Sequence, residues 1–147
     1  MVLSPKKMAL DFGTSIAVPL SRAEDYASKL ASKIKGGEII ALIGELGSGK
    51  TTFVKALGKA LGIHQSISSP TFVIMQEFKI PKRKLYLYHL DLYRTKSFKD
   101  IESLGVTQWW SHPETVTVIE WADKIQKHLP TTAQIIYLYR DATTNEN

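Results

Sequence analysis

The segment GELGSGKT, residues 44–51, constrains this chain more than any other part of its sequence. It fits the pattern G-x-x-x-x-G-K-[ST] without a departure, and it lies between the apolar run EIIALIG and the amphipathic run KTTFVKALGKALG. A buried strand, a glycine-rich loop and a helix in this order are typical of a phosphate-binding loop. The segment therefore predicts an α/β protein that binds a nucleotide.

Each residue type in this loop has a chemical reason to be there. Glycines allow backbone conformations that turn consecutive amides toward an anion, and the first turn of the following helix adds a partial positive charge of about +0.5. Lys50 can reach the β- and γ-phosphates, and the hydroxyl of Thr51 is placed to bind Mg²⁺. We therefore expect ATP or ADP with Mg²⁺ as the ligand.

Hydrophobic periodicity predicts the elements around the loop. We expect a helix from Ser21, capped by Ser21 with Glu24 and ended by Gly36 and Gly37. The further predicted elements, in chain order, are a strand over 38–44, a helix over 50–61 that stops at Gly62, a hairpin of strands over 71–80 and 84–94, a short helix within 96–110 that Ser97 caps, and strands over 115–121 and 133–141. This order predicts a single P-loop domain over residues 1–147, with its core at about 16–141, frayed ends, and helices on a mixed sheet.

Composition narrows the class of protein further. Apolar residues make up 44% of the 147 residues and charged residues 22%, which is ordinary for a soluble domain. The chain has no cysteine, which excludes disulfides, thiolate metal sites and cysteine nucleophiles. Its apolar runs are far shorter than the roughly 20 residues that span a bilayer, and its first residues lack a signal-peptide pattern. We therefore expect a cytoplasmic protein without a membrane partner.

The net charge of +5 leaves two interpretations open. A basic surface suits a nucleic-acid neighbour, but the lysines are spread along the chain and also fit an ordinary solvated surface. The one local cluster, KIPKRK at 79–84, fits the tip of a basic hairpin better than a nucleic-acid site.

Two acidic residues are candidates for the carboxylate that P-loop proteins place at the end of a second core strand. Glu120 ends the buried run VTVI and is the candidate Mg²⁺ ligand; the alternative is a helix-capping or surface carboxylate. Asp91 lies in the apolar and aromatic run YHLDLYR, where it either orients the water that attacks the γ-phosphate or pairs with Arg94.

Three further features carry weaker signals. In SSPTF, residues 68–72, the hydroxyl of Thr71 either faces the nucleotide from a switch-like segment or belongs to an ordinary loop-to-strand junction. His89 among strand aromatics is typical of a hydrogen-bonded core residue. Trp109 and Trp110 are more typical of core or interface anchors than of a ligand platform.

The ordered set GELGSGKTTFVKALGKALG, SSPTF, LYHLDLYR, ESLGV and VIEW resembles the TsaE (YjeE) family. This family comprises bacterial P-loop ATPases of the machinery that makes N6-threonylcarbamoyladenosine (t6A) on tRNA. The resemblance extends from about Ser21 to Pro130. It implies a sheet whose parallel central strands are flanked by antiparallel strands, with helices on both faces.

The resemblance also implies roles for matching residues. Lys50 would contact the terminal phosphates, Thr51 and Glu120 would bind Mg²⁺, and Asp91 and Thr71 would serve hydrolysis. Trp121 matches a family position close to the nucleotide, and residues near Ile16 to Ser21 match a segment that contacts the base. The phosphate-binding residues carried over in this way are Glu45, Leu46, Gly47, Ser48, Gly49, Lys50, Thr51 and Thr52.

The function implied is slow ATP hydrolysis that supports turnover of the threonylcarbamoyl-transferase complex, a TsaB/TsaD-type heterodimer acting at tRNA position 37. Contact with tRNA would be indirect, through that complex. The four arginines, Arg22, Arg83, Arg94 and Arg140, belong to no evident arginine-finger motif, which favours activation by the partners. The sequence QWW at 108–110 departs from the family pattern and concerns the partner surface.

Three other functions stay open at this point. A P-loop small-molecule kinase would need an arginine-rich lid, and the chain has no insertion of lid length. A nucleotide-gated binding module like a small GTPase would carry an N-K-x-D motif, which is absent from the sequence. Direct binding of tRNA is compatible with the charge alone.

Overall fold

The computed structural model describes residues 15–45, 47, 49–67, 75–95 and 97–141. All strands of this described part belong to one sheet with the spatial order β1-β6-β2-β5-β4-β3. The strands are β1 (Ser15–Pro19), β2 (Ile39–Ile43), β3 (Met75–Ile80), β4 (Leu85–Asp91), β5 (Thr115–Glu120) and β6 (Gln134–Tyr139). The helices are α1 (Ala23–Ala31), α2 (Lys50–Ala60) and α3 (Phe98–Glu102), with the 3-10 helices η2 (Leu20–Arg22), η3 (Val106–Trp109) and η4 (Ala122–His128).

Strand directions confirm the expected mixed sheet. Strands β1, β6, β2, β5 and β4 pair with their neighbours in parallel, while β3 pairs antiparallel with β4 along one edge. The antiparallel part is thus the hairpin of β3 and β4, which turns at Pro81 to Lys84 as the sequence predicts. The parallel strands β2, β5 and β4 all end at the same edge of the sheet.

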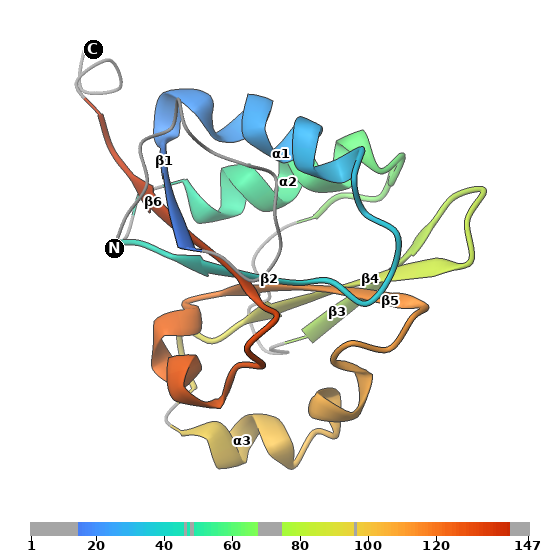
Figure 1. Cartoon of the computed structure of the whole chain (residues 1–147), viewed down its shortest axis with the longest axis vertical. Coiled ribbons are helices and arrows are strands. Elements are labelled where there is room, and N and C mark those ends of the chain that lie inside the picture. The colour runs from blue at the N-terminus through green and yellow to red at the C-terminus, as the bar shows by residue number, and fades with distance from the viewer. Residues whose placement is uncertain (1–14, 46, 48, 68–74, 96, 142–147) are drawn as a thin grey trace.

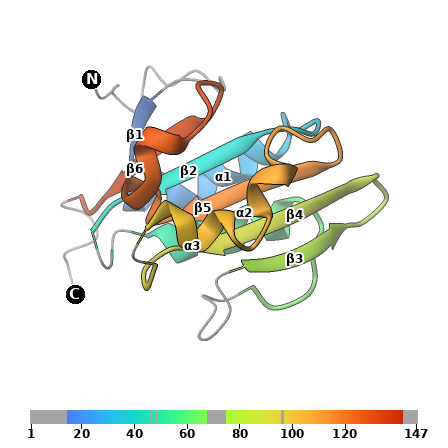
Figure 2. The ribbon, with the colours of Figure 1, turned by 90° about the horizontal axis from the view of Figure 1, so that it is seen from below.

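Helices cover both faces of the sheet (Figure 1). The long helices α1 and α2 lie side by side on one face, where Leu30 and Phe53 are completely buried. On the other face, α3, η3 and η4 bury Ile101, Val106 and Ile125, and Figure 2 shows α3 in front of the strands. The central strand β2 contributes to both layers because Ile40 and Ala41 point to opposite faces. This explains why the run EIIALIG is apolar at every position of the strand.

The first predicted helix differs from the structure at both ends. Helix α1 begins at Ala23 with Arg22 as N-cap and no side-chain capping bond, so the capping box of Ser21 and Glu24 is wrong. The chain leaves β1 through the turn η2, which places Ser21 inside that turn; its hydroxyl donates a hydrogen bond to Asp141 instead. The helix also stops at Ala31, before Gly36 and Gly37, although Ile34 beyond it is still buried in the core.

Other boundaries agree with the sequence more closely. Helix α2 ends at Ala60 and Gly62 follows with a φ of 87°, as its stop signal predicts. Ser97 is the N-cap of α3 with extended backbone, but its side chain makes no capping bond. The elements that were not predicted as such include β1, which pairs with β6, the 3-10 turn η2 after it, and η4, which follows β5. The expected frayed ends, 1–11 and 142–147, lie outside the described residues.

Gly36 is expected to be essential for stability because it is held in a conformation that other residues rarely adopt. Its φ is 125°, and a Cβ atom there would lie 2.0 Å from the carbonyl oxygen of Pro113. We expect Gly36→Ala to lower the free energy of unfolding by about 2–4 kcal/mol in urea denaturation. Gly105→Ala is the matched control: its φ is 75°, but no atom lies within 4 Å of the added Cβ, so the loss should be near 1 kcal/mol. Equal losses for the two variants would contradict this steric explanation.

Candidate functional site

The predicted site residues gather at the edge of the sheet where β2, β5 and β4 end. In the register of the sheet, Leu42 pairs with Glu120 and Glu120 with Asp91, so Glu120 lies beside β2, the strand that leads into the glycine loop, and Asp91 lies one strand further away. Ligands of open α/β sheets bind at the carboxyl ends of parallel strands, where loops and helix N-termini meet. The structure therefore brings together residues that are as far apart in the sequence as Gly44 and Glu120, which are separated by 76 positions.

The glycine loop has the backbone that phosphate binding requires at its described positions. Gly47 and Gly49 have φ angles of 81° and 104°, and α2 begins directly afterwards at Lys50. Leu20 packs against Gly49, where a Cβ would lie 2.3 Å from Leu20 Cδ1. The first amides of α2, which have no partner within the helix, therefore follow the loop directly, and the N-terminus of a helix after a glycine-rich loop is a site that can bind anions.

The side chain of Lys50 lies within this site and is only 5% exposed. Its Nζ donates hydrogen bonds to the carbonyl oxygens of Gly44 and Glu45, the latter at 2.8 Å. The same atom lies 4.0 Å from the centroid of the Trp121 ring, which is a cation–π contact. The lysine predicted to contact phosphates is therefore held over the loop by carbonyls and an aromatic face.

Burial lowers the pKa of Lys50 below its ordinary value, because removal of water penalises the ammonium. The carboxylates of Glu120, Asp123, Asp91 and Glu45 act in the opposite direction. These carboxylates place negative charge around Lys50. Because phosphates are also negative, a site that binds them here requires further positive charge. A divalent cation would supply it.

Glu120 forms the centre of a buried hydrogen-bonded group. It is 2% exposed, its Oε1 accepts a hydrogen bond from Thr51 Oγ1 at 3.2 Å, and its Oε2 lies 2.7 Å from Nε2 of His89. His89 is completely buried, and its Nδ1 lies 3.1 Å from Oε1 of Gln76. These contacts contradict the alternative that Glu120 is a surface or helix-capping carboxylate, and they confirm that His89 is a hydrogen-bonded core residue.

The oxygens of Thr51 and Glu120 fit a magnesium ion. Neighbouring ligands of an octahedral ion with bonds of about 2.1 Å are separated by about 3 Å, close to the 3.2 Å between Thr51 Oγ1 and Glu120 Oε1. Among the described residues, no group of three or more His, Asp or Glu side chains could hold a metal by itself. Two protein oxygens nonetheless suit Mg²⁺, which keeps several waters and takes its remaining ligands from substrate phosphates.

Asp91 ends β4 beside Glu120 and is partly exposed. Its Oδ1 accepts a hydrogen bond from the backbone N–H of Tyr93 at 3.0 Å, which fixes the turn that follows the strand. The backbone N–H of Leu92 also donates to the Glu120 carbonyl at 3.1 Å. The carboxylate of Asp91 is therefore partly accessible and held at the end of β4 by the turn that follows it.

Trp121 has an unusual backbone conformation for a bulky residue, with φ 59° and ψ 37°. A non-glycine residue in this region costs about 1–2 kcal/mol, so the surroundings must hold it there. Its ring contacts Lys50 on one side, and the Tyr93 ring lies 5.1 Å away between centroids. This backbone conformation directly follows Glu120 and places the indole against the ammonium of Lys50.

The remaining predicted residues divide into two groups. Thr52 is exposed on the first turn of α2, and Glu45 contributes its carbonyl oxygen to Lys50. Leu46, Ser48 and Thr71 lie outside the described residues. The segment Ile16 to Ser21 forms β1 and η2, and it reaches the site through the contact of Leu20 with Gly49.

Comparison with known proteins identifies the family of this chain. A model of the family described as "Threonylcarbamoyl adenosine biosynthesis protein TsaE" matches residues 20–147. The chain belongs to the TsaE family. Similar proteins named "tRNA threonylcarbamoyladenosine biosynthesis protein TsaE" include those of Synechocystis, 39% identical over 72% of this chain and 68% of that protein, and of Aquifex aeolicus, 41% identical over 67% and 68%. The relative from Bacillus subtilis is 39% identical over 71% of this chain and 63% of its own length.

A solved structure is similar as well. The crystal structure of YdiB from Bacillus subtilis superposes with a TM-score of 0.59 at 33% identity, covering 77% of this chain and 66% of that one. The chain thus spans about two thirds of the length of the relatives that it matches. Fold and sequence agree on membership of the TsaE family.

Two features of the site were not predicted from the sequence. His89 contacts Glu120 directly, and Gln76 on the edge strand β3 contacts the other side of the His89 ring. Arg140, directly after β6, brings its Nη1 to 3.5 Å from the position of a Cβ on Gly47. The sequence signal available for the contact of His89 was its position two residues before Asp91, which ends the strand. Nothing in the sequence around Arg140 indicates that it lies near the glycine loop.

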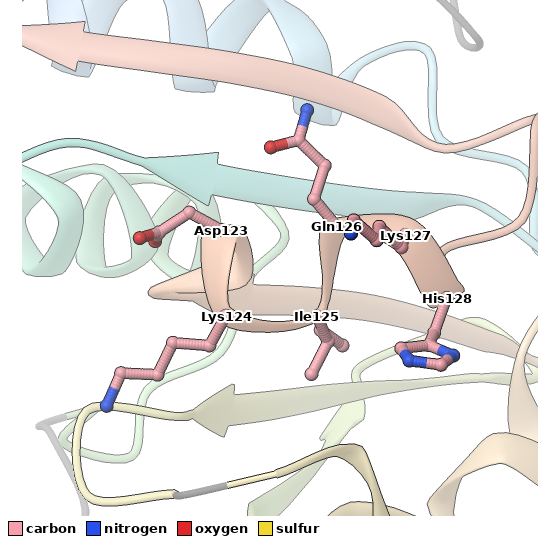
Figure 3. Close-up of a pocket in the computed structure, with 6 residues that line it drawn as sticks. All are labelled: Asp123, Lys124, Ile125, Gln126, Lys127 and His128. Atoms are coloured by element: carbon pink, nitrogen blue, oxygen red, sulfur yellow. The ribbon is translucent and has the colours of Figure 1, made fainter.

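A surface hollow of about 590 Å³ lies along η4, lined by Asp123 to His128 (Figure 3). Lys124 and Gln126 point to opposite sides of this short helix. Lys124 Nζ donates hydrogen bonds to the carbonyl oxygens of Tyr93 and Thr95, which connects η4 to the turn after Asp91. None of the predicted site residues lines the hollow. No helix in the described part of the chain is long and apolar enough to cross a membrane.

Proposed function

We propose that this chain binds and hydrolyses Mg-ATP and thereby supports t6A formation at position 37 of tRNA. The observation that carries the proposal is the contact between Thr51 of the glycine loop and Glu120 at the end of β5, in a member of the TsaE family. A phosphate loop alone would fit many functions. The buried carboxylate beside its threonine is what a nucleotide-hydrolysing site needs in addition.

Each residue of the site has a role in binding that follows from its chemistry. Amides of the loop from Glu45 to Thr52 and the N-terminus of α2 surround the phosphates, and Lys50 moves from its carbonyl contacts to the terminal phosphate oxygens. Thr51 and Glu120 would hold Mg²⁺, which neutralises charge that develops on the phosphates during transfer. Trp121 supports Lys50 and limits access of water to it.

Hydrolysis requires a positioned water molecule. Asp91 lies beside Glu120 in the register and can accept a hydrogen bond from that water, while Thr71 would act from the segment SSPTF. The oxygen of the water bonds to the γ-phosphorus as the bond to the β,γ-bridging oxygen breaks, and ADP and phosphate leave. Arg140 is the arginine found beside the loop, and a partner's arginine would add a rate increase of about 10³- to 10⁵-fold.

The proposed partner is the threonylcarbamoyl-transferase complex, a TsaB/TsaD-type heterodimer in the cytoplasm, with tRNA contacted through that complex. The names of the relatives support a place in t6A biosynthesis. The exposed aromatic residues Tyr93 and Trp109 are candidates for contact with the partners, since such anchors are enriched at interfaces.

The test is multiple-turnover formation of t6A by the purified transferase heterodimer, with tRNA, ATP and threonylcarbamoyl-adenylate, with and without this chain. We expect product to exceed one equivalent of heterodimer only when the chain is present with hydrolysable ATP. ATP hydrolysis by the chain should rise when the heterodimer is added. Turnover that continues equally well with a non-hydrolysable ATP analogue would contradict the proposal, as would phosphate transfer from ATP to a nucleoside or small alcohol.

A further inference from the structure

We propose that His89 is a positioning residue for the magnesium-binding carboxylate, acting through Glu120 without touching nucleotide or metal. The proposal rests on the proposed function, because it assigns a support to the magnesium site described above. His89 lies on the strand next to the edge strand β3. This histidine lies on β4 in register with Val118 of β5 and has no exposed surface.

The two oxygens of Glu120 have separate partners. Oε2 lies 2.7 Å from His89 Nε2, and Oε1 lies 3.2 Å from Thr51 Oγ1. An ionised carboxylate only accepts hydrogen bonds, so a carboxylate that serves as a magnesium ligand requires the proton of this contact on Nε2 of the histidine. The hydrogen bond with His89 therefore uses Oε2 of Glu120. Oε1 stays available for the magnesium ion that Thr51 would also bind.

The other side of the imidazole ring is also held. Nδ1 lies 3.1 Å from Oε1 of Gln76, on the neighbouring strand β3, and Gln76 pairs with His89 in the register of the hairpin. Rotation of the ring would break both contacts at once. The line Gln76, His89, Glu120 and Thr51 therefore connects the edge strand β3 to the start of α2 through four side chains.

This arrangement has a physical purpose in a buried site. Glu120 is 2% exposed, so water cannot orient its carboxylate, and a carboxylate free to rotate would lose configurational entropy each time magnesium bound. A fixed hydrogen bond from His89 prepares the orientation before the ion arrives. Partners of metal-binding carboxylates commonly contribute 10- to 100-fold to metal affinity.

The experiment measures the dissociation constant of ADP by calorimetry in magnesium and in EDTA, and compares the ratio of the two between variants. We expect His89→Phe, which keeps the ring but removes the donor, to lower the magnesium-dependent gain about 10-fold or more, with little change in EDTA. His89→Gln should retain most of the gain because its amide nitrogen reaches the position of Nε2. His89→Asn, whose amide reaches only the position of Nδ1, should lose the gain as His89→Phe does.

Val118→Ala is the control for a general loss of core packing: it removes buried atoms beside His89 and should leave the ratio unchanged. Thermal melting of each variant establishes that the measured protein is folded. A ratio equal to that of the wild type in folded His89→Asn or His89→Phe would overturn the proposal. Absence of any magnesium-dependent gain in the wild-type protein would instead overturn the proposed function, which separates the two failures.

Discussion

Lys50→Met is expected to weaken ATP and ADP binding about 100-fold or more. The loss corresponds to about 3 kcal/mol, the upper range for a hydrogen bond to a charged group in a site that excludes water. Lys50 lies over the loop with 5% exposure, and its Nζ contacts the carbonyl oxygens of Gly44 and Glu45. Calorimetry with both nucleotides in the presence of magnesium checks this expectation.

Lys55→Met provides the matched control for this variant. Lys55 lies on the exposed side of the same helix, so its replacement removes the same charge outside the site and should change affinity less than about threefold. The thermal midpoint of Lys50→Met without nucleotide should not fall, because burial of this ammonium is unfavourable, as its lowered pKa indicates. Equal affinity of Lys50→Met and wild type would show that the phosphates bind elsewhere.

Glu120→Gln is expected to reduce ATP hydrolysis about 10³-fold while the protein stays folded. The replacement keeps the shape of the side chain and one acceptor oxygen, but it turns the other oxygen into an amide donor and removes the charge that would bind magnesium. Loss of a metal ion's stabilisation of the transition state amounts to several kcal/mol, which is the basis of this magnitude. Phosphate release measured with saturating ATP gives the rate.

Glu114→Gln is the control for Glu120→Gln, since Glu114 is exposed before the same strand and its replacement changes the net charge equally. ADP affinity in EDTA should be similar in wild type, Glu114→Gln and Glu120→Gln, and only the last should lose the gain from magnesium. Hydrolysis by Glu120→Gln at more than a tenth of the wild-type rate would contradict the assignment of Glu120 as a magnesium ligand.

The parts of the site that follow local rules were predictable from the sequence. The glycine loop depends on its own residues, so its position between β2 and α2 agrees with expectation. Glu120 and Asp91 were predictable because an acidic residue at the end of an apolar strand is costly unless it is used. Their adjacency then follows from the parallel register of β4 and β5.

The parts that depend on distant partners were not predictable. Strand β1 has a weak hydrophobic pattern of its own, and it forms a strand by pairing with β6. Ser21 does not cap the helix because its hydroxyl donates a hydrogen bond to Asp141, 120 residues away. The support of Glu120 by His89 likewise depends on a register that no local pattern contains. The left-handed backbone of Trp121 follows from packing against Lys50 and Tyr93 and has no signal in the sequence.

The most direct test of the central claim is the t6A content of tRNA in the organism that encodes this chain. The gene is deleted or depleted, and total tRNA is digested and analysed by mass spectrometry. We predict loss of t6A that is restored by the wild-type gene and by Lys55→Met, but not by Lys50→Met or Glu120→Gln expressed at equal levels. Normal t6A without the gene, or full restoration by Lys50→Met, would contradict the account.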